Sequence, residues 1–194
     1  MYAYLQGKFT YKSPAQVHVD VNGVGYEVNI SLNTFSQIQN LEGGKLFTQL
    51  QVREDAHVIY GFFEKQEKDM FVMLTSVSGV GASTARMMLS SLKPEEVGLA
   101  IMQSNVKQLE SVKGIGKKTA ERLVLELKDK VGKYSTDANV SIHMGNSLET
   151  DALNALTALG ISRTQAEQSI QKIIRAEPTV PILEDLIKKA LKAI

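Results

Sequence analysis

The chain has 194 residues, a net charge of +1 and no cysteine. This length fits one large or two to three small domains, and the lack of cysteine excludes a disulfide framework and a thiolate metal site. No apolar run approaches the roughly 20 residues that a membrane-spanning helix needs, and the start of the chain has no apolar signal region. We therefore expect a cytoplasmic protein with no membrane partner.

Residues 1–64 carry the alternation of polar and apolar residues that is typical of half-buried strands. An Asn-Gly pair at 22–23 adds a strong hairpin signal. A short helix is expected over 34–39, with Thr34 and Gln37 at the spacing of a capping box. Five strands and one short helix predict a small OB-type β-barrel, whose clearest strand segments are 16–21, 26–30, 46–52 and 56–63.

Two acidic residues, Glu54 and Asp55, lie between the last two of these strand segments. By their pattern alone they form a solvated turn between two strands.

Residues 65–132 change to helical spacing, and two copies of one glycine motif break the helices. Both copies have the form apolar-x-Gly-apolar-Gly-x-x-Thr-Ala, starting at Val77 and at Val112. Paired glycines allow a sharp turn, and the amides at the start of the following helix are left without partners and favour an anion. The repeat predicts a tandem helix-hairpin-helix that holds DNA phosphates, through residues Gly79, Val80, Gly81, Ser83, Thr84, Gly114, Ile115, Gly116, Lys117, Lys118 and Thr119.

Other glycine-rich loops do not fit these two segments. A Walker phosphate loop would need a glycine where Ser111 stands, and a serine or threonine where Lys118 follows Lys117. A dinucleotide fingerprint would need a third glycine at an offset that neither copy provides.

The positive charge is concentrated on the glycine motifs. Residues 77–133 hold ten Lys and Arg against six Asp and Glu, whereas residues 1–64 hold four against six. This distribution favours a phosphate-binding surface on the helical segment.

The remainder of the chain predicts a tether and a small helical module. Residues 133–147 have no steady period and many helix breakers, so we expect a flexible linker. Residues 148–194 predict three short helices, a module that favours docking to a partner over catalysis. Leu156, Leu159 and Leu191 are candidate docking contacts, and the pattern equally allows them to form the core of the module.

On these motifs the chain resembles the RuvA family, the Holliday-junction-binding subunits of bacterial branch migration complexes. The most specific stretch runs from Gly114 to Lys130, and Arg53-Glu54-Asp55 followed by Tyr60-Gly61-Phe62 is also distinctive. The order of barrel, double hairpin, linker and helical module matches the family throughout.

The resemblance implies an α+β multidomain fold and a sequence-independent, non-catalytic subunit that needs no cofactor and no metal. It implies a homotetramer, which in this family also pairs into an octamer, with a four-way junction lying open on one face. Glu54 and Asp55 would form an acidic pin at the crossover. The module at 148–194 would dock the hexameric ATPase RuvB, and the resolvase RuvC is a further candidate partner.

Two positions depart from the family pattern. Ala82-Ser83 stand where the family commonly has Pro-Lys, and Lys113 stands where it commonly has Pro. The first hairpin therefore lacks a cation and would hold phosphate mainly through backbone amides and Ser83.

Two alternative functions follow from the same residues. A helix-hairpin-helix glycosylase or lyase would pair Lys117 or Lys118 with a downstream aspartate, for which Asp129 is available. A single-strand DNA binder would need basic and aromatic residues on the barrel face, although the barrel segment is net acidic.

Overall fold

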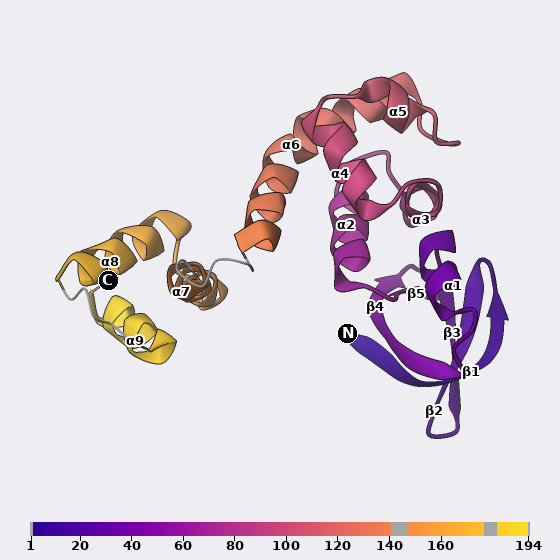
Figure 1. The fold of residues 1–194 in the computed structure, drawn as a ribbon, viewed down its shortest axis with the longest axis horizontal. Coiled ribbons are helices and arrows are strands. Elements are labelled where there is room, and N and C mark those ends of the chain that lie inside the picture. The colour runs from indigo at the N-terminus through magenta and orange to yellow at the C-terminus, as the bar shows by residue number, and fades with distance from the viewer. Residues whose placement is uncertain (1, 141–146, 177–181, 194) are drawn as a thin grey trace. The chain divides into compact units, whose positions relative to one another are not determined.

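The computed structural model describes the backbone of residues 2–140, 147–176 and 182–193, and the side chains of these residues except 133–140, 147, 150 and 176. The chain divides into two compact units, residues 1–132 and 133–194 (Figure 1).

The first unit begins with the predicted barrel, which is closed in the order β1-β2-β3-β5-β4. The pairing of β3 with β5 is parallel and the other pairings are antiparallel. Inward-facing side chains of alternating strand residues fill the barrel, among them Val17, Val19 and Leu46. The strands are β1 (Tyr4–Ser13), β2 (Gln16–Val21), β3 (Val24–Ile30), β4 (Gly43–Val52) and β5 (His57–Phe62).

Two details of the barrel differ from the sequence prediction. The alternation did not locate β1, and the short helix α1 spans Leu32–Ile38 rather than 34–39. Ser31 caps α1 by accepting a hydrogen bond from the Thr34 amide. The predicted capping box at Thr34 is therefore wrong, because the Thr34 hydroxyl is buried and bonds to a different helix.

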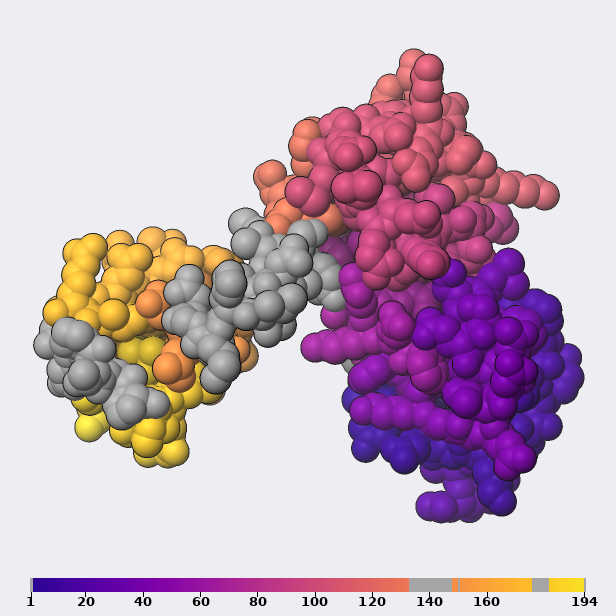
Figure 2. Space-filling view, viewed as in Figure 1, coloured from indigo at the N-terminus to yellow at the C-terminus, as the bar shows by residue number. Residues whose placement is uncertain are grey.

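Five helices follow the barrel and share one apolar core with it. Figure 2 shows the surface of the barrel continuing into the surface of these helices. The core includes Tyr60 and Phe62 of β5, whose rings lie 5.0 Å and 4.9 Å from the ring of Phe71. The helices are α2 (Lys65–Thr75), α3 (Ala82–Ser91), α4 (Pro94–Met102), α5 (Val106–Glu110) and α6 (Lys117–Val140).

Helix α6 is longer than the sequence predicts. The sequence predicts helices up to residue 132 and a linker from residue 133, but α6 continues through Gly132 to Val140. Gly132 does not have the positive φ of a helix-ending glycine. Residues 133–140 are thus helical rather than an irregular linker, and the rest of the expected linker, 141–146, lies outside the described residues.

The second unit is the predicted three-helix module: α7 (Ser147–Ala158), α8 (Arg163–Ala176) and α9 (Leu183–Ala193). Gly160, with a φ of +91°, allows the turn after α7. Ser162 accepts a hydrogen bond from the Gln165 amide at the start of α8. The three helices share a core that includes Ala152, Leu156 and Ile170.

Candidate nucleic-acid interface

The first hairpin joins α2 to α3. The Val80 amide donates to the Val77 carbonyl at 3.0 Å, and Gly79 turns the chain with a φ of +93°. Val77 and Val80 are buried in the helical core. The two apolar side chains therefore hold the loop down while Gly79 and Gly81 stay exposed.

The second hairpin joins α5 to α6 with the same backbone. The Ile115 amide donates to the Val112 carbonyl at 3.0 Å, Gly114 has a φ of +94°, and both apolar residues are buried. The sequence repeat is therefore a structural repeat.

The two glycines of each hairpin have different structural roles. Positive φ occurs at Gly79 and Gly114 but not at Gly81 or Gly116, so only the first glycine of each pair is needed for the turn. A Cβ atom on Gly81 or Gly116 would meet nothing within 4 Å. The second glycine instead leaves open space beside the backbone, which lets a ligand approach closely.

Both hairpins end on the exposed N-terminus of a helix. The first hydrogen bonds within these helices run from the Ala85 amide to the Gly81 carbonyl and from the Ala120 amide to the Gly116 carbonyl. The amides that come before Ala85 and Ala120 point out of the helix end, as the geometry of a helix terminus requires. Gly81 is the N-cap of α3, and no side-chain hydrogen bond from this position covers these donors.

The hairpins face each other. A Cβ atom on Gly79 would have Thr119 as its nearest neighbour, and one on Gly114 would have Thr84. Arg122 of α6 donates to the Ser78 carbonyl of the first hairpin at 3.4 Å. The structure thus brings the two motifs together on one surface, except for the predicted residues Val80 and Ile115, whose side chains are buried beneath it.

Charge on this surface is uneven. Lys117 and Lys118 are exposed in the first turn of α6. In α3 the matching residues are Ala82, which is buried, and Ser83, which is exposed. The first cation after the first hairpin is Arg86, one turn further along α3.

Glu54 and Asp55 occupy the turn between β4 and β5. The turn is closed by a hydrogen bond from the Arg53 amide to the Ala56 carbonyl at 2.8 Å, and both carboxylates are exposed. Barrel strands on both sides anchor the turn, so it presents two negative charges at a fixed place on the barrel.

A buried carboxylate joins the barrel to α2, and the sequence patterns gave no sign of it. Glu67 accepts hydrogen bonds from the hydroxyls of Ser31 and Thr34, and Thr34 also accepts from the Phe63 amide at 3.0 Å. Burial raises the pKa of Glu67, and the two hydroxyl donors oppose this rise.

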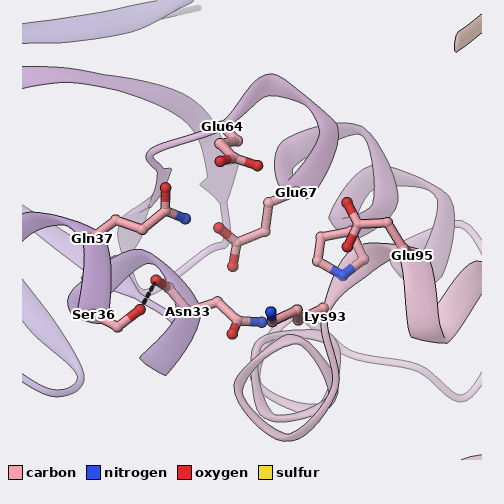
Figure 3. Close-up of a pocket in the computed structure, with 8 residues that line it drawn as sticks. Asn33, Ser36, Gln37, Glu64, Glu67, Lys93 and Glu95 are labelled. Atoms are coloured by element: carbon pink, nitrogen blue, oxygen red, sulfur yellow. Dashed lines mark hydrogen bonds between the residues drawn. The ribbon is translucent and has the colours of Figure 1, made fainter.

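Glu67 lines a cavity of 340 Å³ between α1 and the start of α4. Figure 3 shows its carboxylate directed toward the middle of this cavity, with Gln37 and Lys93 on either side. Glu64 and Glu95 add two more carboxylates to the lining. Among the described residues, however, no group of three or more His, Cys, Asp or Glu is placed to hold a metal ion.

The three leucines proposed for docking separate into two kinds. Leu156 is fully buried, which assigns it to the core of the module. Leu159 and Leu191 are 63% and 42% exposed.

Within the described part of the chain, no helix is both long enough and apolar enough to cross a bilayer.

A closed five-stranded barrel followed by two facing hairpins defines a tandem helix-hairpin-helix protein. Family comparisons agree along the chain: the RuvA N-terminal domain matches residues 1–61, the SAM-like helix-hairpin-helix tandem matches 71–129, and the RuvA C-terminal domain matches 147–194. The chain belongs to the RuvA family.

Curated relatives carry the name Holliday junction branch migration complex subunit RuvA. The protein from Christiangramia forsetii is 49% identical over 192 residues, and that from Flavobacterium psychrophilum is 47% identical over the same length. The protein from Cytophaga hutchinsonii is 46% identical over 197 residues. In each case the match covers 99% of both chains.

Proposed function

We propose that this chain is the subunit of a branch migration complex that binds four-way DNA junctions without reading sequence. The observation that carries this proposal is the pair of facing hairpins, each of which directs helix N-terminal amides away from the protein. Amides and lysines at such places bind phosphate groups, which every sequence presents in the same way.

The hairpins supply affinity in this proposal. The buried residues Val80 and Ile115 fix each loop before DNA arrives, so little ordering is needed on binding. Gly81 and Gly116 leave room for the phosphodiester backbone. Lys117 and Lys118 add charge that strengthens binding by releasing counterions from the DNA.

The acidic turn supplies the preference for an open crossover. Glu54 and Asp55 form a pin whose negative charge repels phosphates at short range. A crossover held around such a pin would keep its arms apart and its separated strands guided.

Four protomers around one junction give each arm one pair of hairpins, which supports a homotetramer with four-fold symmetry. Pairing of two tetramers into an octamer would enclose the junction from both faces. We propose no catalytic role for the chain itself: ATP hydrolysis would belong to the hexameric partner RuvB, docked through residues 148–194. RuvC is proposed as a further partner that acts on the bound junction.

The lyase alternative fits the geometry poorly. Asp129 follows Lys117 by 12 residues on α6, which separates them by about 18 Å along the helix axis. Such a separation does not let the pair act on one atom. Trapping with borohydride on damaged duplex distinguishes the two functions, since only a lyase forms a covalent adduct.

The single-strand alternative has one observation in its favour. Lys45 lies 4.7 Å from the ring centroids of both Tyr4 and Phe47 on the barrel. The lysine, however, lies over the ring faces on which bases would stack. Competition between a four-way junction and a single strand tests this alternative, and we expect the junction to win.

The experiment that tests the proposed function is a titration of four-way junction against linear duplex of equal length, with the mass of the complex recorded in solution. We expect clear preference for the junction and a complex of four protomers per junction face. Equal affinity for the two DNA forms would overturn the proposal.

Docking of the motor needs a separate test. A chain that ends at residue 147 retains the first compact unit, so we expect junction binding to persist and stimulation of the ATPase to be lost. Retained stimulation would contradict docking through the module.

A further inference from the structure

Hydrogen bonds join α3, the helix that follows the first hairpin, to the barrel segment at two places. Leu32 and Asn33 of α1 donate to the C-terminal end of α3, at Ser90, Leu89 and Leu92, and an arginine makes the link that lies nearer to the hairpin. Arg86 lies on α3, five residues after Gly81. Its Nη1 donates to the Asn29 Oδ1 at 2.8 Å and to the Ala15 carbonyl at 3.1 Å. Both acceptors belong to the barrel, so α3 is tied to β3 and to the turn that precedes β2.

Asn29 is itself connected to the strand that follows the acidic pin. In the parallel ladder of β3 and β5, Asn29 pairs with Tyr60. Strand β5 begins at His57, directly after the turn 53–56 that carries the pin residues Glu54 and Asp55. A short series of hydrogen-bonded and packed residues therefore leads from the pin through β5 and Asn29 to Arg86 and the first hairpin.

The sequence repeat does not account for this arginine. The residue five positions after Gly116 in the second hairpin is Glu121, which is exposed on α6. Arg86 is also half-buried, and its planar guanidinium donates two hydrogen bonds from one nitrogen. These features indicate that Arg86 has a role in joining the first hairpin to the barrel, with no counterpart at the second hairpin.

We propose that Arg86 is a positioning residue: through Asn29 it fixes the first hairpin relative to the acidic pin, and the preference for crossed over linear DNA depends on this geometry. The inference rests on the proposed function. Linear duplex needs only the hairpins, whereas a junction must meet hairpins and pin together. Loosening the link therefore costs junction binding and spares duplex binding.

The test is the Arg86→Met variant, which removes the guanidinium and keeps an apolar side chain. We expect the ratio of junction affinity to duplex affinity to fall about tenfold, the effect of losing a charge-assisted hydrogen bond. Duplex affinity and its dependence on salt should stay unchanged. Asn29→Leu removes one of the two hydrogen bonds of Arg86 and should give a smaller loss in the same direction. The double variant should lose no more than Arg86→Met alone, because Asn29 acts through Arg86.

Two further variants serve as controls. Asn29→Asp keeps an acceptor for Arg86 and should retain the preference. Lys12→Met breaks a comparable barrel contact, in which Lys12 Nζ donates to the carbonyls of Gln39 and Leu41 at 2.7 Å and 2.8 Å. It touches neither hairpin nor pin, so its junction preference should equal that of the wild type.

Three results would overturn the inference. A parallel loss of duplex affinity with a smaller salt slope would make Arg86 a phosphate contact. An unchanged preference in folded Arg86→Met and Asn29→Leu would leave Arg86 a purely structural role. Loss of the preference together with dissociation of the oligomer would assign Arg86 to an interface between protomers. Failure of the proposed function is distinct, because the wild type itself would then show no preference.

Discussion

A Cβ atom placed on Gly79 would lie 4.0 Å from the hydroxyl oxygen of Thr119 in the opposite hairpin. The relationship is reciprocal, since a Cβ atom on Gly114 would lie 4.0 Å from Cγ2 of Thr84. The two motifs thus pack as near copies facing each other. Phosphates bound by them would be neighbours on one stretch of DNA, which is the arrangement that a backbone clamp requires.

The same distances predict the effect of alanine at the turn glycines. Because 4.0 Å is ordinary contact, Gly79→Ala and Gly114→Ala do not clash, and their cost comes from positive φ alone. We expect each to lower the free energy of unfolding by about 1–2 kcal/mol and to weaken junction binding as the loop relaxes. Urea unfolding and a gel-shift titration measure the two effects.

Gly81→Ala is the matched control for this pair of variants. Gly81 has an ordinary φ of −78° and open space around it, so stability should be unchanged or slightly raised. Equal destabilisation by Gly79→Ala and Gly81→Ala would contradict the assignment of the turn to the first glycine.

Substitution of Lys117 and Lys118 by glutamine should weaken binding to junction and duplex alike. If each lysine meets one phosphate, the slope of log affinity against log salt should fall by about 0.9 for each lysine removed. Lys172→Gln with Lys192→Gln removes the same charge from exposed positions of the second unit and should leave the slope unchanged. An unaltered slope in the Lys117 and Lys118 variant would exclude both as phosphate contacts.

The sequence could predict those features whose cause is local. Glycine pairs around one apolar residue predicted both hairpins, and strand alternation with Asn22-Gly23 predicted the barrel. The cap at Ser31 could not be found in this way, because Thr34 has the better local spacing. What decides between them is Glu67, a residue more than thirty positions away. The sequence also did not predict the full length of α6. Glycine is a residue type that commonly ends a helix, but the backbone of Gly132 remains helical.

Neutralising the acidic pin separates affinity from strand guidance. Glu54→Gln with Asp55→Asn removes two exposed charges that would repel phosphates. We expect junction affinity to be retained or to rise by up to about tenfold, most at low salt, where repulsion is least screened. Glu27→Gln with Glu42→Gln makes the same charge change elsewhere on the barrel. A large loss of affinity in the pin variant alone would rule out a repulsive role.

The leucines of the second unit form a matched pair. Leu156→Ala empties a fully buried position and should destabilise the module by about 2–5 kcal/mol. Leu159→Ala, at a position that is 63% exposed, should change stability by less than about 0.5 kcal/mol. If the exposed leucine contacts the motor, the Leu159 variant should still reduce ATPase stimulation. Normal stimulation by a stable Leu159→Ala protein would exclude that contact.

Glu67 gives the first unit a pH dependence whose sign follows from burial. Desolvation raises the pKa of Glu67 in the folded state above the unfolded value of about 4.3. The folded protein therefore holds this proton more tightly than the unfolded chain does. This contribution to stability is fully present below the unfolded pKa and is lost as pH rises through the folded pKa.

Other carboxylates also contribute to the pH dependence of stability. The informative quantity is therefore the difference in the free energy of unfolding between the wild type and Glu67→Gln. Glutamine cannot titrate, and the wild type should lose stability relative to this variant as pH rises from about 4 through the raised pKa of Glu67. Urea unfolding at a series of pH values measures the difference, with Glu121→Gln as the control for net charge. A difference that grows in the opposite direction would mean that the Ser31 and Thr34 hydroxyls outweigh burial, and that the carboxylate is held charged at the joint between barrel and hairpins.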